Sequence, residues 1–282
     1  MQVITRLGFL FFALILAAAA QAADYDIKAP GRVVAFGDVH GAYDDWVALL
    51  QELKVIDAQL NWSGGNTHLV SLGDLIDRGS GSRDVVRLLM QLDKQAEQAG
   101  GAVHMVLGNH EVMVMVGDLR YVSKEEFAAF AGEETAAQRE ALYAQYRRFN
   151  PGGDDATVRA TFDEQYPPGF SALRKAYSRQ GTLGWWLSQQ PFVIKVNDKV
   201  YTHGGIAKAP ASNSLSALNN SLRKELRAYL DSMETLHEAG QMPLHVSYGD
   251  RLQFLNARVE EFVAANPNTR APWFDAVQQV FE

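Results

Sequence analysis

The chain has 282 residues, of which 47% are hydrophobic and 21% are charged, so its composition excludes intrinsic disorder and a membrane-embedded helical bundle. Its formal net charge of -7 excludes the broad basic surface of a general nucleic-acid-binding protein. It contains no cysteine. A disulfide or a thiolate ligand is therefore excluded, and any metal site must use Asp, His, Asn or Glu.

The first segment has the pattern of a secretory signal peptide. Arg6 precedes an apolar run over residues 7–20, and Ala20-Gln21-Ala22 forms a small-x-small cleavage site. This run is shorter than the ~20 residues that a membrane-spanning helix needs. We expect cleavage after Ala22, a mature domain of residues 23–282 without membrane attachment, and a periplasmic or secreted location. An uncleaved membrane anchor is the alternative.

Three apolar runs, each closed by glycine and a polar residue, predict buried strands. They span residues 32–36, 68–72 and 103–107, and helical patterns at about 44–53 and 83–98 separate them. Alternation of strand and helix predicts parallel pairing with right-handed crossovers. In such sheets the ligand site lies beyond the carboxyl ends of the strands, so the polar residues would meet there.

Individual helices and a hairpin can also be predicted. Asp44 or Asp45 is expected to cap the first helix, and Leu49 is expected on its buried face with Trp46. Residues 123–180 are rich in Ala, Glu, Gln, Arg and Tyr, which predicts a helical insertion that caps the site. A hairpin over 192–202 follows, then helices from Ser214 onwards and near the C-terminal end.

The predicted strand ends present residues suited to metal chemistry. Asp38 and His40, at i and i+2 of an extended chain, point the same way and can bind one ion. Asp74 can bridge two ions, and Asn109 and His203 follow the later strands. Each residue alone is equally consistent with a helix cap, a polar turn or a structural histidine. Their joint occurrence at four strand ends with glycine favours a shared metal site.

Four sequence blocks resemble the signature of the calcineurin-like metallophosphoesterases. The blocks are residues 37–41 (GDVHG), 73–79 (GDLIDRG), 108–111 (GNHE) and 203–205 (HGG). They are most similar to the PPP-type phosphoprotein phosphatases, the serine/threonine-phosphatase branch. Residues 117–122 (GDLRYV) resemble the Shewanella-like protein phosphatases within that branch.

The resemblance implies both a fold and an activity. The fold would be α/β, with a central β-sandwich flanked by helices in four layers, plus the helical cap insertion. The activity would be that of a metal-dependent phosphomonoesterase, in which two divalent ions (Mn, Fe or Zn) share a bridging hydroxide that attacks phosphorus in line. The substrate would be a phosphorylated protein or peptide, or a small phosphoester. The alternative substrate is a dinucleoside polyphosphate or another nucleotide.

The resemblance also implies a role for each matching residue. The first ion would be held by Asp38, His40 and Asp74, and the second ion by Asp74, Asn109 and His203. Arg78 would bind phosphate oxygens in a bidentate contact. His110 would protonate the leaving oxygen, with Asp77 orienting its ring.

One expected ligand has no counterpart in the sequence. The resemblance implies a further histidine on the second ion, from a later strand that ends in Gly-His. Beyond His203 the chain has only His237 and His245, and neither follows such a strand. We therefore expect the sequence to be truncated at its C-terminal end, with His245 as a substitute ligand being the alternative. A non-catalytic metal or phosphate binder is the corresponding alternative function.

Overall fold

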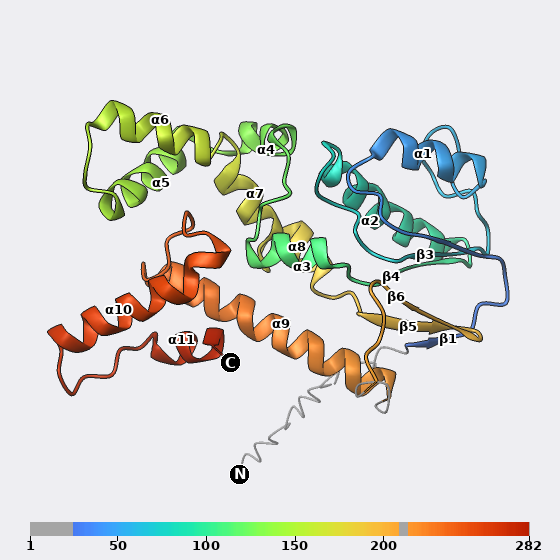
Figure 1. The fold of residues 1–282 in the computed structure, drawn as a ribbon. Coiled ribbons are helices and arrows are strands. Elements are labelled where there is room, and N and C mark those ends of the chain that lie inside the picture. The colour runs from blue at the N-terminus through green and yellow to red at the C-terminus, as the bar shows by residue number, and fades with distance from the viewer. Residues whose placement is uncertain (1–24, 209–213, 282) are drawn as a thin grey trace, which may run out of the picture.

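The computed structural model describes residues 25–208 and 214–281 and contains two three-stranded sheets surrounded by helices (Figure 1). In the first sheet, the strands β2 (Val33–Phe36), β3 (His68–Ser71) and β4 (Ala102–Met105) pair in parallel in that order. In the second sheet, β5 (Val193–Val196) pairs in parallel with β1 (Asp26–Ile27) and antiparallel with β6 (Lys199–Thr202). The predicted strands, their parallel order and the hairpin are confirmed.

The two sheets pack against each other through a small apolar cluster. Val70 from β3 and Val106 after β4 contact Ile194 and Val196 from β5 in this cluster. Helices α1 (Tyr43–Glu52) and α2 (Ser82–Gln98) contribute to a larger core that includes Leu69, on the opposite face of the first sheet. The arrangement is a small β-sandwich with flanking helices, so the expected α/β fold class is confirmed.

The remaining helices form two lobes beside the sandwich, as Figure 1 shows. The first lobe and its connection to the sheets contain α3 (Asn109–Val116), α4 (Lys124–Phe130), η1 (Ala131–Glu133), α5 (Ala136–Phe149), α6 (Asp155–Gln165), α7 (Phe170–Tyr177) and α8 (Thr182–Leu187). The second lobe contains α9 (Leu215–Glu238), η3 (Tyr248–Asp250), α10 (Arg251–Ala265) and α11 (Phe274–Phe281). The range 123–180 is therefore largely helical, as the composition predicts.

Side-chain caps explain where several of these helices begin. Ser123, Thr135, Asp154 and Ser214 each accept a hydrogen bond from the backbone N–H three residues later, at the starts of α4, α5, α6 and α9. Such bonds satisfy N–H groups that have no partner within the helix. The long helix expected after Ser214 is α9.

The prediction for the first helix was wrong in two details. Ala42 precedes α1 and makes no side-chain cap, so Asp44 and Asp45 lie inside the first turn, where a negative charge suits the helix dipole. Leu49 is 42% exposed, because only the narrow stripe through Trp46 and Leu50 faces the core.

The predicted signal peptide over residues 1–22 lies outside the described residues. Within 25–208 and 214–281, no helix is both long enough and apolar enough to span a bilayer.

Two arginines hold the C-terminal end of α3, the helix that begins with the Asn109-His110-Glu111 block. Arg174 from α7 donates to the carbonyl of Val114 at 3.2 Å. Arg251 from α10 donates to the carbonyls of Val116 and Gly117. The carbonyl of Val114 also accepts the N–H of Gly117, whereas the carbonyls of Val116 and Gly117 lie at the end of the helix. Positive charge stabilises the negative end of the helix dipole. Both helical lobes thus help to fix α3 against the strand ends.

A buried carboxylate connects α4 to the start of α2. Oε2 of Glu126 accepts a hydrogen bond from the backbone N–H of Ser82 at 3.1 Å. Oγ of Ser82 in turn accepts from the backbone N–H of Asp77 at 3.1 Å. Burial raises the pKa of Glu126 to about 7, although the hydrogen bonds from Ser82 favour its charged form. Desolvation therefore destabilises the charged carboxylate by more than its hydrogen bonds stabilise it.

This raised pKa predicts a loss of stability as the pH increases. The unfolded carboxyl titrates near 4.5, so the stability contributed by protonated Glu126 is fully present below that pH and is lost as the pH rises through about 7. The shift corresponds to about 3 kcal/mol. Denaturant unfolding at pH 5 and pH 8 should show a smaller pH-dependent loss for Glu126→Gln than for the wild type. Exposed Glu125 provides the control Glu125→Gln. If the stability of all three proteins depends on pH in the same way, the pKa of Glu126 is not raised.

Candidate metal centre

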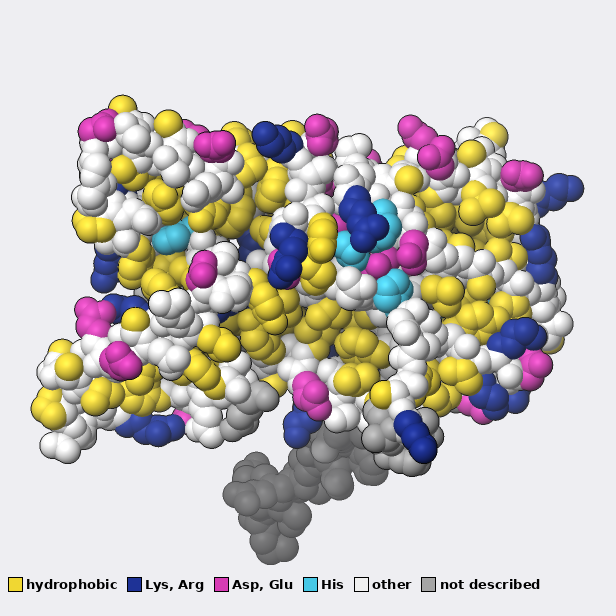
Figure 2. Space-filling model, in the orientation of Figure 1, with side chains coloured by type: hydrophobic (Ala, Val, Ile, Leu, Met, Phe, Trp, Pro, Cys, Tyr) yellow, Lys and Arg dark blue, Asp and Glu magenta, His cyan; other side chains and the backbone are white. Residues whose placement is uncertain are grey.

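Loops from both sheets bring the predicted site residues together. Asp38 and His40 follow β2, Asp74 follows β3, and His203 follows β6. Asn109 begins α3, directly after the turn that follows β4. Figure 2 shows histidine, acidic and basic side chains gathered on one face of the molecule, over these loops. The convergence that the motifs predict is therefore present.

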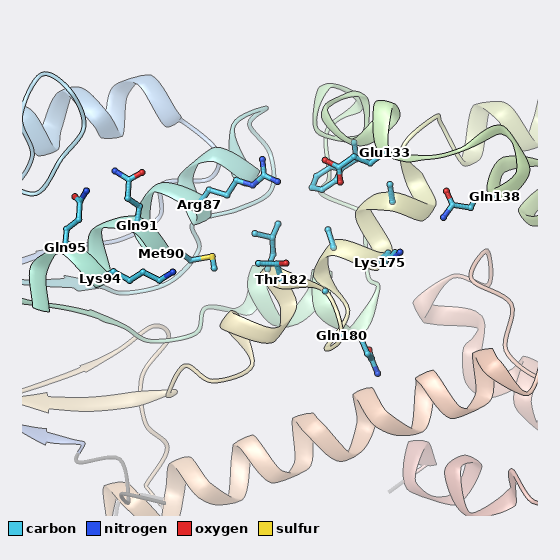
Figure 3. Close-up of a pocket in the computed structure, with 15 residues that line it drawn as sticks. Arg87, Met90, Gln91, Lys94, Gln95, Glu133, Gln138, Lys175, Gln180 and Thr182 are labelled. Carbon is cyan, nitrogen blue, oxygen red and sulfur yellow. The ribbon is translucent and has the colours of Figure 1, made fainter. Parts of the chain in front are cut away.

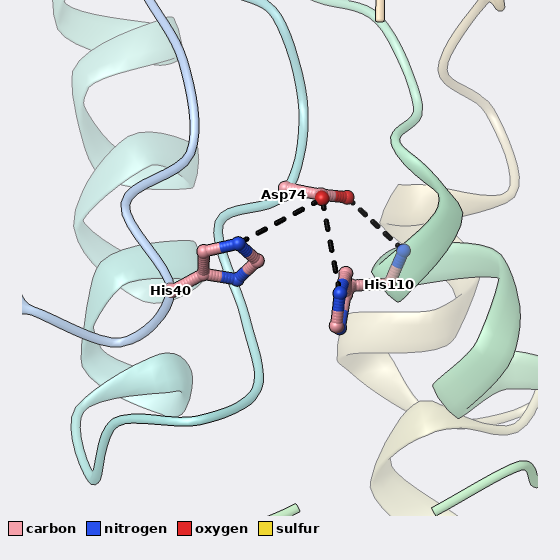
Figure 4. Close-up of side chains that lie close together, drawn as sticks. All are labelled: His40, Asp74 and His110. Carbon is pink, nitrogen blue, oxygen red and sulfur yellow. Dashed lines mark hydrogen bonds and ion pairs between the residues drawn. The ribbon is translucent and has the colours of Figure 1, made fainter. Parts of the chain in front are cut away.

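One oxygen of Asp74 faces three imidazole rings. Oδ2 of Asp74 lies 3.2 Å from Nε2 of His203, 3.8 Å from Nε2 of His40 and 3.9 Å from Nε2 of His110. Figure 4 shows His40 and His110 on two sides of this carboxylate. Oδ1 of Asp74 accepts the backbone N–H of His110 at 3.1 Å. The hydrogen bond to Oδ1 thus holds Asp74 in place, and Oδ2 points towards the three imidazole rings.

Two groups of side chains that could hold a metal ion share this carboxylate. Asp38, Asp74 and His203 form the first group, and His40, Asp74 and His110 form the second. Within each group the candidate ligand atoms lie within 4.8 Å of one another. A carboxylate that belongs to two adjacent groups is in the position that a bridging ligand occupies.

The hydrogen bond that His203 makes through Nδ1 leaves its Nε2 facing an amide oxygen. Nδ1 of His203 donates to the carbonyl of Leu72 at 2.8 Å, so Nε2 of the neutral ring is an acceptor. Yet this Nε2 lies 3.1 Å from Oδ1 of Asn109, which is also an acceptor. Acceptor atoms repel at such distances unless a proton or a cation lies between them. The donor set therefore fits a cation.

His40 is oriented in the same way. Its Nδ1 donates to the carbonyl of Ile76 at 3.0 Å, which directs Nε2 towards Asp74. Backbone carbonyls that fix ring orientation in this manner are typical of histidines that bind metals through the other nitrogen. Carboxylate, imidazole and amide ligands suit divalent ions such as Mn, Fe and Zn.

The loops that carry these residues adopt a strained backbone. The φ angles of Asp38, His40, Asp74, Asp77 and Arg78 lie between 48° and 70°. Non-glycine residues rarely adopt this left-handed region, and each instance costs on the order of 1–3 kcal/mol. Backbone hydrogen bonds stabilise the conformation, because the N–H groups of His40 and Gly41 donate to the carbonyls of Asp74 and Leu75.

Glu111 connects the loops after β3 and β4. Its side chain is completely buried, and its two oxygens accept the backbone N–H groups of Asp74, Leu75 and Gly108 at 2.8 to 2.9 Å. Burial raises the pKa of Glu111, whereas these three hydrogen bonds lower it. The sequence motif contains this glutamate, but sequence reasoning assigned it no role.

A second network lies beside the two groups. Nδ1 of His110 donates to Oδ2 of Asp77 at 2.7 Å, and Nη2 of Arg78 donates to Nε2 of His110 at 3.2 Å. Burial raises the pKa of Asp77, and the hydrogen bond from His110 counteracts this effect. The ring of Tyr121 lies 5.1 Å from that of His110. The carbonyl of Tyr121 accepts the N–H of Arg78 at 2.9 Å.

The alternative ligand His245 does not join this centre. It belongs to neither group of potential ligands among the described residues, and its ring packs against Tyr146, Phe149 and Tyr166. It lies in the loop between α9 and η3, two residues after Pro243. The alternative in which His245 substitutes for a missing ligand is therefore wrong for this structure.

A cavity of about 690 Å³ lies elsewhere, between α2, η1, α7 and α8 (Figure 3). Its lining includes Arg87, Lys94, Lys175 and Thr182, but none of the residues at the strand ends. The candidate metal centre instead lies on the open face shown in Figure 2.

Comparison with known families places these motifs in a wider context. The model of the family described as calcineurin-like phosphoesterase matches residues 31–266. This range contains every residue of both groups and most of the two helical lobes.

Two known proteins are similar to this chain over about 200 residues. The chain is 30% identical over 202 residues to Shewanella-like protein phosphatase 2 of Arabidopsis thaliana, with 69% of this chain and 51% of the relative covered. It is 28% identical over 203 residues to Shewanella-like protein phosphatase 1 of Plasmodium berghei, with 72% and 47% covered. The chain thus spans about half the length of these curated relatives.

A solved structure is also similar. A cold-active protein tyrosine phosphatase has a TM-score of 0.51 and 33% sequence identity, with 72% of this chain and 51% of that chain covered.

The packing around Gly108 predicts that even a methyl group will disturb the centre. A Cβ at this position would lie 2.1 Å from Oδ1 of Asp74 and 2.5 Å from its backbone nitrogen. Gly108→Ala should therefore displace Asp74 and lower Mn²⁺ affinity at least tenfold, measured by calorimetric titration. Gly132, around which nothing lies within 4 Å, provides the control Gly132→Ala. Unchanged affinity in Gly108→Ala would show that Asp74 does not bind the ion.

The three hydrogen bonds to Glu111 predict a stability cost for a neutral isostere. Glu111→Gln replaces one acceptor oxygen by a donor that faces backbone N–H groups, and each unsatisfied buried group costs about 1–3 kcal/mol. Denaturant unfolding should show a loss in this range. Exposed Glu97 offers the matched variant Glu97→Gln, which should unfold like the wild type. If the two variants are equally stable, Glu111 does not hold the loops together.

Proposed function

The chain belongs to the calcineurin-like phosphoesterase family, and from that premise we propose that it is a metal-dependent phosphomonoesterase that acts on phosphorylated proteins or peptides. The observation that carries the proposal is the carboxylate of Asp74, shared by two groups of ligands that lie beside the Asp77–His110–Arg78 network. The names of the relatives, which are protein phosphatases, support the choice of substrate class.

We propose that the centre binds two divalent ions. Asp38, Asp74 and His203, with Asn109 beside them, would hold one ion, and His40 with Asp74 would hold the other. This grouping differs from the one that the resemblance implies, in which Asp38 shares an ion with His40. When bound, such a pair of ions makes water a nucleophile at neutral pH and offsets the charge of the phosphoryl oxygens. The ligand types are compatible with Mn, Fe or Zn.

Residues beside the centre would bind the phosphoryl group and move the proton. The guanidinium of Arg78 can form two parallel hydrogen bonds to phosphoryl oxygens, which would replace its bond to His110. Because Nδ1 of His110 is bonded to Asp77, Nε2 is the atom that can exchange a proton with the leaving oxygen. The carboxylate of Asp77 orients the ring through this hydrogen bond.

An assay with three substrate types tests the proposal. The purified protein, supplied with Mn²⁺, should hydrolyse an aryl phosphate and release inorganic phosphate from phosphopeptides, but should not cleave dinucleoside polyphosphates to nucleotides. Hydrolysis confined to the dinucleoside polyphosphates would identify a nucleotide hydrolase. If a cooperatively folded protein binds Mn²⁺ without hydrolysing any substrate, it is a non-catalytic binder.

The proposed role of His110 predicts a dependence on the leaving group. His110→Ala should lower kcat by about 10²–10⁴ for an alkyl phosphate, whose leaving oxygen needs a proton. The loss should be much smaller for p-nitrophenyl phosphate, whose leaving group is stable as an anion. Metal analysis of the same variant should still find the wild-type ion content. An equal loss for both substrates would contradict proton donation by His110.

The proposal includes a location outside the cytoplasm. Its support is the pattern of residues 1–22, which has the charge, the apolar run and the cleavage site of a signal peptide. Cell fractionation followed by N-terminal sequencing tests it: a mature extracytoplasmic protein that begins at Ala23 is expected, whereas a cytoplasmic protein that retains residue 2 would contradict it.

A further inference from the structure

A separate pocket of about 390 Å³ lies beside the candidate metal centre. Its walls come from residues 117–120 between α3 and α4, the end of α6, the start of α7 and residues 244–249 before α10. In Figure 1 these segments face one another between the two helical lobes. The volume is within the range of about 300–1,000 Å³ that is typical of pockets for small ligands.

Aromatic side chains form much of the lining. Phe170 stacks on Phe127 with the ring centroids 6.1 Å apart, and Tyr166 meets Phe170 edge-to-face at 5.1 Å. Tyr248, at the rim, is 43% exposed. Aromatic rings favour another aromatic ring in offset or edge-to-face geometry, by about 0.5–1.5 kcal/mol beyond the area buried.

The wall of the pocket also contains a buried histidine. His245 lines the pocket and is only 8% exposed. Its Nδ1 has no hydrogen-bond partner among the described residues, although its backbone carbonyl accepts from the hydroxyl of Tyr166 at 2.9 Å. Because this nitrogen is shielded from solvent, His245 contributes to the pocket through its ring, which packs against Tyr146 and Tyr166.

The charged residues of the lining neutralise each other. Nε and Nη2 of Arg120 donate to the two oxygens of Asp118 at 2.9 and 2.7 Å. Asp118 and Arg120 are the Asp and Arg side chains that line this pocket, and Lys and Glu do not contribute to it. The pocket therefore suits an uncharged group rather than a second phosphate or an ammonium group.

The pocket and the candidate metal centre are joined by consecutive residues. Arg120 lines the pocket, and the next residue, Tyr121, contacts the rings and backbone of the Asp77–His110–Arg78 network. Consecutive Cα atoms are about 3.8 Å apart, and an extended peptide advances about 3.3 Å per residue. A substrate whose phosphoryl group is at the centre can therefore reach the pocket with a side chain only a few residues away.

We infer that this pocket is a subsite for an aromatic side chain of the phosphorylated peptide, located a few residues from the phosphorylated residue. The inference rests on the proposed phosphatase function and adds a specificity element to it. Tyrosine and tryptophan are suitable occupants, because each presents a large uncharged aromatic ring to the aromatic lining.

Steady-state kinetics with matched peptides test the subsite. The substrates are phosphopeptides of one sequence in which a single tyrosine or tryptophan is moved through each position flanking the phosphorylated residue, with alanine elsewhere. For the wild type, one position should raise kcat/KM roughly tenfold over the all-alanine peptide. Tyr248→Ala, which removes one wall at the rim, should reduce this preference to less than about threefold.

Two controls separate the subsite from a general defect. Tyr248→Ala should hydrolyse p-nitrophenyl phosphate at the wild-type rate, because this substrate does not reach the pocket. Leu252→Ala changes an exposed residue of α10 outside the pocket lining and should keep the full peptide preference. Equal wild-type rates for all peptides would overturn the inference. So would a Tyr248→Ala variant that retains the preference or that loses activity on every substrate alike.

Peptide binding keeps the two proposals distinguishable. Fluorescein-labelled versions of the same peptides are titrated with the wild type and with Tyr248→Ala. For each protein, the Kd of the all-alanine peptide is divided by the Kd of each peptide that carries an aromatic residue. If no substrate is hydrolysed, the proposed function is wrong, but a position-specific ratio that Tyr248→Ala abolishes still supports the subsite. A ratio of one at every position overturns it.

Discussion

The carboxylate of Glu111 holds the loops after β3 and β4 together, and the geometry of the candidate metal centre depends on that contact. By accepting the N–H groups of Asp74, Leu75 and Gly108, it fixes the backbone from which Asp74 extends. Asp74 can then offer Oδ2 to His40, His110 and His203 at once. The buried charge of Glu111 is costly, so the N–H groups that satisfy it cannot separate cheaply.

The left-handed backbone of the loops after β2 and β3 and the position of α3 also contribute to the geometry of the candidate metal centre. Positive φ angles turn Asp38, His40 and Asp74 out of the strand direction and towards one another. Helix α3, which supplies Asn109, His110 and Glu111, is held at its far end by arginines from α7 and α10. Both helical lobes therefore contribute to the position of the site, although α7 and α10 supply no residue of either group of potential ligands.

The sequence predicts the strand ends well because their signal is local. Apolar runs closed by glycine, as before Asp38 and Asp74, identify both the strand and the polar residue that follows it. The contacts that hold the site in place are not local: Glu111 bonds to residues 36 and 37 positions away, and Arg251 bonds to a carbonyl 135 positions away. No periodicity encodes such contacts. The exposure of Leu49 and the aromatic surroundings of His245 likewise depend on which elements pack there.

Metal stoichiometry tests the central claim, which is that one carboxylate serves two adjacent sites. Dialysed protein reloaded with Mn²⁺ should contain two ions per chain by elemental analysis. His40→Ala and His203→Ala should each retain one ion, because each removes a ligand of only one site, whereas Asp74→Ala should retain neither. The account would be contradicted if Asp74→Ala kept an ion, or if His40→Ala and His203→Ala each lost both.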